Sequence, residues 1–122
     1  MNIITAIAIF IGGGLGSLSR FGISLFFQNQ NIVSLPWATL SSNIISTTLL
    51  GIVMFKYANS INPGFLLLIT VGFCGGFSTF STFSLETFQL IRNGQHLWAA
   101  LNIAASVGAC LIILYFLEKS IS

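Results

Sequence analysis

Residues 97–117 read LWAALNIAASVGACLIILYFL, a stretch without one charged side chain. A transmembrane α-helix needs about 20 consecutive, mostly apolar residues, so this stretch predicts a helix that crosses a lipid bilayer. The rest of the chain has the same character, because its 122 residues include only four Lys or Arg and two Asp or Glu, and its mean hydropathy is +0.97. So few charges cannot form a water-facing surface or a basic face, which excludes an ordinary soluble domain and a nucleic-acid binder.

Three more apolar segments precede this stretch, at about residues 3–27, 36–55 and 65–91. They are separated by polar turns at residues 28–31, 59–64 and 92–96. Because these turns are short, consecutive helices should run in opposite directions and pack as neighbours. We therefore expect an all-α integral membrane protein, with a single four-helix transmembrane domain over residues 1–122.

The cations are divided almost evenly between the two ends of this expected bundle. Lys56 and Lys119 fall on the side of the two termini, whereas Arg92 falls on the other side and Arg20 lies inside the first segment. The positive-inside rule therefore predicts no clear orientation in the membrane. Two interpretations stay open, namely insertion in both orientations, or one orientation weakly set by the N-terminal amine and Lys56.

Polar side chains recur along one face of the second and the fourth segments. Small hydroxyl residues at helical spacing usually let helices approach and hydrogen-bond, and this packing role is expected for the Ser and Thr residues. Asn43 differs, because its amide must find partners inside the membrane and such groups often mark ion pathways. Cys74 and Cys110 lie in apolar stretches and are expected to be buried small hydrophobes. The polar residues on these faces are Thr39, Asn43, Ser46, Thr47, Asn102 and Ser106.

The third segment contains GFCGGFSTFSTFS at residues 72–84. The adjacent Gly75 and Gly76 weaken a helix near its middle, and freed backbone carbonyls could bind a cation such as sodium. The alternative is a close helix crossing at these glycines. Phe80 and Phe83 share a face among hydroxyl residues, so that their electropositive ring edges could line an anion path. The alternative for them is an aromatic packing stripe.

Residues 72–84 followed by x-Glu86 closely resemble the signature of the CrcB/Fluc fluoride ion channels. Gly12-Gly13-x-x-Gly16-x-x-x-Arg20 is similar to the first-helix motif of that family, and Thr39-Leu40-x-x-Asn43 resembles its second-helix motif. The resemblance extends over all four segments. Ser78 departs from it, standing where the family usually has Thr.

This resemblance implies an antiparallel, dual-topology homodimer with four helices per subunit and a third helix that is broken near its middle. It implies that Asn43 is a pore donor, that Phe80 and Phe83 contact fluoride, and that Ser81 and Thr82 form a polar track. The backbone carbonyls of Gly75 and Ser78 would hold a structural sodium ion at the dimer interface. Arg20 and Glu86, the only ionisable side chains well inside the segments, would have vestibule roles.

The function that this resemblance implies is a fluoride-selective channel in the cytoplasmic (inner) membrane of a bacterium. It would export fluoride from the cytoplasm by passive electrodiffusion and so confer fluoride resistance. Nothing in the chain resembles a nucleophile, an acid–base pair or a cofactor site, so an enzyme is not expected. One alternative is a small dual-topology multidrug or cation transporter, which would need a mid-membrane acid to couple protons. The other is a non-conducting assembly subunit.

Overall fold

The structure, a computed structural model, describes residues 1–28 and 36–121. Apart from Gln28, the polar turn predicted at residues 28–31 lies outside these residues. The described part is helical, and four helical segments in it are long and apolar enough to cross a membrane, which confirms the prediction of an all-helical chain with four helices of bilayer length. These segments are Ile3–Gln28, Trp37–Tyr57, Pro63–Arg92 and His96–Ile121.

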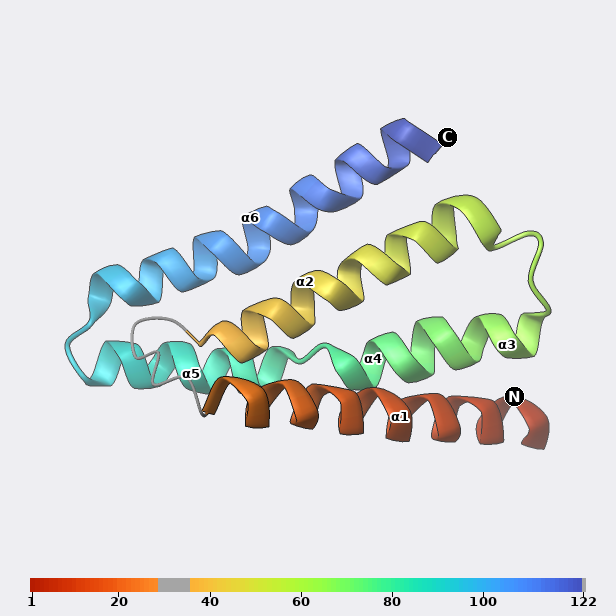
Figure 1. Cartoon of the computed structure of the whole chain (residues 1–122), viewed down its shortest axis with the longest axis horizontal. Helices are drawn as coiled ribbons and strands as arrows, with labels where there is room; N and C mark the ends of the chain where they lie inside the picture. Colours follow the sequence, from red (N-terminus) through yellow and green to blue (C-terminus); the bar gives the residue numbers. More distant parts are fainter. Residues whose placement is uncertain (29–35, 122) are drawn as a thin grey trace.

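The first and last spans are single helices, α1 (Ile3–Gln28) and α6 (His96–Ile121) (Figure 1). The last helix therefore continues beyond residue 117, where hydropathy placed its end. The second span joins α2 (Trp37–Ile52) to a wider π-helical turn, Val53–Tyr57. The third span is composite: α3 (Pro63–Leu67), a π-helical stretch (Leu68–Phe73), α4 (Cys74–Phe77) and α5 (Phe80–Arg92) follow one another.

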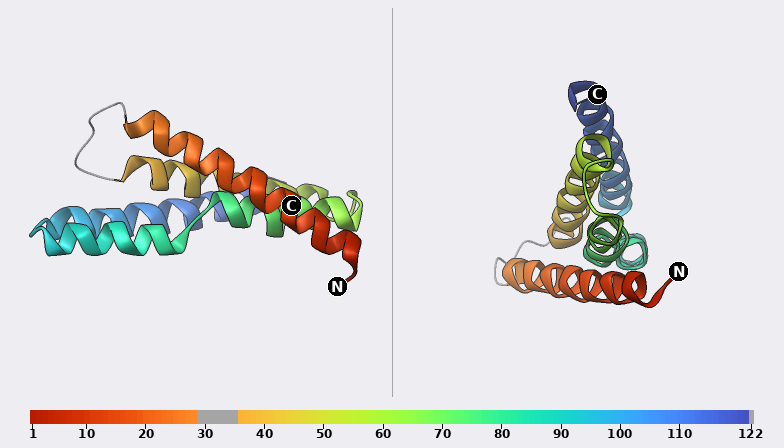
Figure 2. Two further views of the ribbon diagram at one scale, coloured as in Figure 1. Left: turned by 90° about the horizontal axis from the view of Figure 1, so that it is seen from below. Right: turned by 90° about the vertical axis from the view of Figure 1, so that its right-hand side faces the viewer.

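Consecutive spans run in opposite directions, so both termini lie at the same end of the molecule (Figure 1). The second and third spans occupy the middle, and α1 and α6 flank them on opposite sides (Figure 2). The third span changes neighbours along its length. Its π-helical stretch and α4 pack against α1, whereas α5 packs against α6 and α2.

The contact between α1 and the third span is made by glycines that let the two backbones touch. A Cβ atom on Gly16 would overlap the carbonyl oxygen of Phe73, and one on Gly76 would lie 2.5 Å from the carbonyl oxygen of Gly13. Gly12 and Gly72, four residues earlier on each helix, are as tightly enclosed. Small residues at this spacing are typical of close helix pairs in membranes. The close crossing considered for the Gly75-Gly76 pair thus occurs at Gly76, whereas nothing lies within 4 Å of a Cβ at Gly75.

Between α4 and α5 the backbone leaves the helical conformation for two residues, Ser78 and Thr79, which we call the extended link. Their φ and ψ angles are −83° and 159°, and −154° and 124°. Gly75 and Gly76, where the sequence analysis placed the weakest point of the helix, are themselves helical. The link therefore begins two residues after the glycines, where hydroxyl side chains can pair the backbone groups that a helix no longer satisfies.

Candidate functional site

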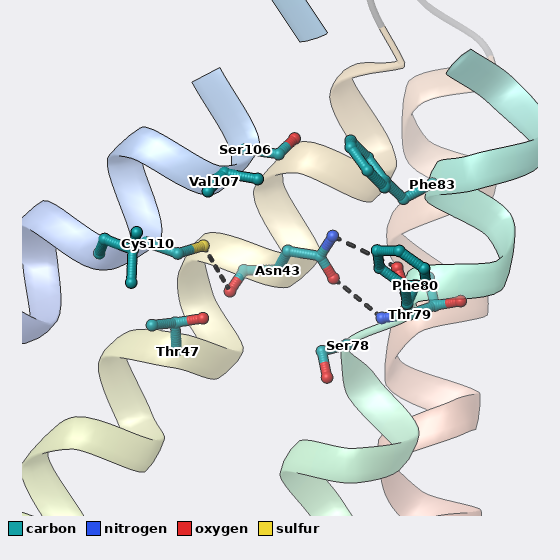
Figure 3. A pocket seen from close by; sticks show the side chains of 10 residues that line it. Asn43, Thr47, Ser78, Thr79, Phe80, Phe83, Ser106, Val107 and Cys110 are labelled. Atoms are coloured by element: carbon teal, nitrogen blue, oxygen red, sulfur yellow. Dashed lines mark hydrogen bonds between the residues drawn. The ribbon is translucent and has the colours of Figure 1, made fainter. Parts of the chain in front are cut away.

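The side chain of Asn43 on α2 pairs with the backbone of the extended link. Its Oδ1 accepts a hydrogen bond from the N–H of Thr79 at 2.9 Å, and its Nδ2 donates to the carbonyl oxygen of Thr79 at 3.4 Å (Figure 3). Inside a membrane, backbone groups outside a helix need such partners because no water is present to bind them. Asn43 is thus the residue on α2 that makes an extended conformation possible at Thr79.

Hydroxyl groups satisfy the helix ends on either side of the link. The Oγ1 of Thr79 accepts from the N–H of Thr82 at 3.2 Å and so caps the first turn of α5. On the α4 side, the carbonyl oxygen of Cys74 accepts from the hydroxyls of Ser78 at 2.8 Å and Ser46 at 3.0 Å. The run of Ser and Thr in the third segment therefore supports the link locally, with Ser46 contributing from α2.

A pocket of about 310 Å³ opens beside the link, between α2, α5 and α6 (Figure 3). Its surface is mainly apolar, with amide and hydroxyl groups contributed by α2, the link and α6. No charged side chain is among the described residues that line it. The lining residues are Asn43, Thr47, Ser78, Thr79, Phe80, Phe83, Ser106, Val107, Cys110 and Leu111.

The two aromatic rings of the pocket differ in their surroundings. Phe83 is 9% exposed and packed within the chain, whereas Phe80 is 79% exposed. Their ring centroids lie 5.9 Å apart, with the ring planes tilted by 41°. Phe83 thus belongs to the packed interior of this chain, and Phe80 projects from it almost without contacts.

The structure brings only some of the predicted pore residues together. Asn43, Phe80 and Phe83 line the pocket, as does Ser78. Ser81 and Thr82 do not line it. Ser81 is exposed with its Oγ 3.3 Å from the Oγ1 of Thr79, and Thr82 contributes its backbone N–H to the cap of α5.

Arg20 and Glu86 also lie outside the pocket, and each contacts a neighbouring helix. The Nε of Arg20 donates to the carbonyl oxygen of Gly76 at 3.3 Å, where its charge faces the carbonyl end of α4. The Oε1 of Glu86 accepts from the hydroxyl of Thr39 at 2.8 Å. The Oε2 of Glu86 is buried, and no partner for it lies within the described residues.

The residues that α6 contributes to the pocket were not predicted from the sequence. Ser106 was assigned to helix packing, yet its buried Oγ has no hydrogen-bond partner in the residues described and borders the pocket. Cys110 was expected to be buried, but it is half-buried and its Sγ donates to the backbone carbonyl of Asn43 at 3.7 Å. Asn102, Ser106 and Cys110 follow one another at four-residue spacing, and this face of the last segment was the available signal.

Four bilayer-length helices and a pocket without charged side chains place this chain in the class of multi-pass α-helical membrane proteins. The chain belongs to the CrcB family: residues 7–117 match the family described as CrcB-like protein, Camphor Resistance (CrcB). This match confirms the resemblance that the motifs of the first three segments indicated.

Several bacterial proteins are similar to the chain over most of its length. It is 39% identical over 109 residues to the fluoride-specific ion channel FluC of Serratia proteamaculans, covering 88% of this chain and 85% of that protein. It is 42% identical over 114 residues to FluC 1 of Yersinia pseudotuberculosis, with 88% and 89% covered. Identity to FluC of Escherichia coli K12 is 43% over 99 residues, with 80% and 77% covered. The chain is therefore a multi-pass membrane protein of a bacterial family whose relatives are named as ion channels and not as enzymes.

Proposed function

We propose that the chain forms a fluoride-selective channel that exports fluoride from the cytoplasm by passive electrodiffusion and confers fluoride resistance. The observation that carries this proposal is the pocket in which the Asn43 amide, Phe80 and Phe83 meet without a charged residue. Fluoride gives up its water only where hydrogen-bond donors replace it, and conduction requires binding that is weak enough for release. The names of the relatives, fluoride-specific ion channels, support fluoride as the conducted ion.

The conducting unit that we propose is an antiparallel homodimer whose subunits insert in opposite orientations. Phe80 supports this proposal because its ring lines the pocket and is 79% exposed, so that this chain by itself leaves one side of the pocket open. A second copy of the chain would supply that side and cover the ring. The even division of the cations between the two ends fits insertion in both orientations into the bacterial inner membrane.

We further propose that the extended link is the break in the third helix and that it holds a structural sodium ion between the subunits. The carbonyls of Gly75 and Ser78 are the proposed ligands, since no hydrogen-bond donor of the described residues reaches either one. The neighbouring carbonyls are already used, that of Cys74 by hydroxyl groups and that of Gly76 by Arg20. Unpaired carbonyls at a helix interruption suit a hard cation.

We also assign roles along this path to the remaining predicted residues. Ser81 and Thr82, in the first turn of α5, are proposed as a polar track that the ion meets beyond Phe80. Arg20 and Glu86 are proposed to act in the vestibules. In this chain each also contacts a neighbouring helix, since Arg20 binds the end of α4 and Glu86 binds Thr39.

The test is fluoride efflux from proteoliposomes loaded with potassium fluoride and containing the purified protein, followed with a fluoride electrode. We expect release that needs no proton gradient and that is lost in Phe80→Ile, whose folding should be intact because the side chain is so exposed. Exchange of lipophilic cations for protons would instead establish the transporter alternative. If a well-folded wild-type protein gives no anion flux, the remaining interpretation is a non-conducting assembly subunit.

The sodium ion and the topology have separate tests. Replacing sodium by a large organic cation during purification should weaken the dimer, and a dimer indifferent to sodium removal contradicts a structural ion. Reporter cysteines placed in the turns at residues 59–64 and 92–96 should each be labelled from both sides of the membrane. Labelling of each turn from a single side would rule out dual topology.

A further inference from the structure

Asn102 is the most deeply buried polar residue of α6 and is not part of the proposed pore lining. Its side chain is 0% exposed, and its Nδ2 donates to the Oγ1 of Thr87 on α5 at 2.9 Å. The hydroxyl of Thr87 donates in turn to the carbonyl oxygen of Phe83 at 2.7 Å. Because a hydroxyl has a single proton, Thr87 can only accept from Asn102. The three residues therefore form a directed chain of hydrogen bonds from α6 to the backbone of α5.

This chain of hydrogen bonds lies one helical turn away from two walls of the pocket. Phe83 precedes Thr87 by one turn on α5, and Ser106 follows Asn102 by one turn on α6. Phe83 and Ser106 both line the pocket. The Asn102–Thr87 hydrogen bond therefore joins α6 to α5 within one turn of both walls.

The burial of Asn102 has a cost that packing alone does not justify. Its Oδ1 is buried, and no partner for it is found among the described residues. An unpaired buried acceptor destabilises a fold, whereas an apolar residue of similar shape would not. A hydroxyl that donates and accepts at once makes both hydrogen bonds stronger in a medium of low dielectric. We therefore attribute the role of the Asn102 amide to its hydrogen bond with Thr87.

We propose that Asn102, acting through Thr87, is a positioning residue that sets the gap between Phe83 and Ser106 and thereby the rate at which the anion passes. The inference rests on the proposed function as a fluoride channel. It assigns the buried amide of Asn102 to the geometry of the pore and not to general helix packing.

The experiment compares fluoride efflux from proteoliposomes for Thr87→Val, Thr87→Ser and Asn102→Ala with the wild-type protein. Valine keeps the shape of threonine without the hydroxyl, and serine keeps the hydroxyl. Thr70→Val is the matched control, because the Oγ1 of Thr70 donates at 2.9 Å to the carbonyl oxygen of Leu66 in the same span, away from the pocket. We expect efflux to fall by roughly fivefold in Thr87→Val and in Asn102→Ala, as loss of one interhelical hydrogen bond within a membrane implies. Thr87→Ser and Thr70→Val should conduct like the wild-type protein.

A double variant separates positioning from simple weakening of the fold. If one chain of hydrogen bonds carries the effect, Thr87→Val with Asn102→Ala should conduct no worse than the poorer single variant. Losses that multiply, or equal losses in Thr70→Val, would overturn the inference. So would full efflux in Thr87→Val. Each variant is first checked for a monodisperse dimer, with Thr87→Ala replacing Thr87→Val if the latter does not fold. An inactive wild-type protein would refute the proposed channel itself, which is a different outcome from any of these.

Discussion

The two halves of the third span pack by opposite means. Residues 63–77 lie against α1 through glycines, with backbone atoms of the two spans in direct contact. The second half, α5, is joined to its neighbours by hydrogen bonds between side chains, through Glu86 to α2 and through Thr87 to α6. Backbone contact leaves no room between helices, whereas side-chain contact holds helices apart. The pocket lies along the second half, beside the link that separates the two.

The difference shows how one apolar span can serve both as an anchor and as the wall of a site. Ser78 and Thr79 change the backbone direction, so α5 need not follow the close crossing that Gly76 makes with α1. Asn43 makes this change possible by satisfying Thr79. Substitutions in the first half of the span should therefore act through steric overlap with α1. Those in the second half should act through loss of hydrogen bonds.

The largest effect is expected for Gly16→Ala, which tests the backbone contact of the first half. Its Cβ would overlap the carbonyl oxygen of Phe73, and backbone cannot move aside as a side chain can. We expect a loss of about 3 kcal/mol or more in the free energy of unfolding, measured by denaturant titration in detergent micelles. Gly14→Ala is the control, since nothing lies within 4 Å of its Cβ and alanine favours a helix. Equal stability of the two variants would remove the distinction between the halves.

The next effect is expected for Asn43→Leu, which acts on the link itself. The N–H and carbonyl of Thr79 would both lose their partner within the membrane. Leaving such groups unpaired should lower the free energy of unfolding by about 2 kcal/mol. Thr47→Val, on the same helix and also lining the pocket, should change it by much less. A leucine variant as stable as the wild-type protein would mean that the link does not depend on Asn43.

A smaller effect is expected for Thr39→Val, which tests the side-chain packing of the second half. The variant removes the hydroxyl that donates to Glu86 and preserves the shape of the side chain. Interhelical hydrogen bonds in membranes contribute about 1 kcal/mol, and the thermal unfolding midpoint should fall accordingly. The hydroxyl of Thr48 bonds only to the carbonyl of Ile44 in its own helix, so Thr48→Val serves as the reference. If both variants behave alike, the contact between Thr39 and Glu86 does not stabilise α5.

The smallest effect is expected for Ser46→Ala. The carbonyl oxygen of Cys74 would lose one donor but keep the N–H and the hydroxyl of Ser78. An acceptor that stays paired should cost only about 0.5 kcal/mol, within reach of a careful denaturant titration. A loss as large as that of Asn43→Leu would show that α2 supports both ends of the link equally.

Part of this architecture could be predicted from single segments of sequence. Hydropathy placed four spans because an apolar run of bilayer length needs no knowledge of its neighbours. Asn43 was singled out because an amide inside a membrane must have a partner, and the structure identifies that partner as Thr79. Phe80 and Phe83 were predicted to line an anion path from their shared face and their hydroxyl neighbours, and the pocket brings them together with Asn43.

Other features could not be predicted because they depend on which faces of the helices pack against each other. Gly75 and Gly76 are adjacent and identical, yet a Cβ would be tolerated at one and obstructed at the other, because Gly76 alone faces α1. Spacing showed that Asn102 and Ser106 share a face of α6, but not that this face meets α5. The same limit applies to Arg20, whose partner is a carbonyl 56 residues away in the chain.

The sequence by itself determined that this chain is a bundle of four membrane-spanning helices of the CrcB family, since apolar length and local motifs are properties of each segment alone. Only the tertiary structure decided where the third span leaves the helix, which wall α6 gives to the pocket and how Asn102 reaches Phe83. These features arise from contacts between segments. Inside a membrane the partners of buried polar groups lie on another helix or in their own backbone, and only the packing of the helices determines which partner is within reach.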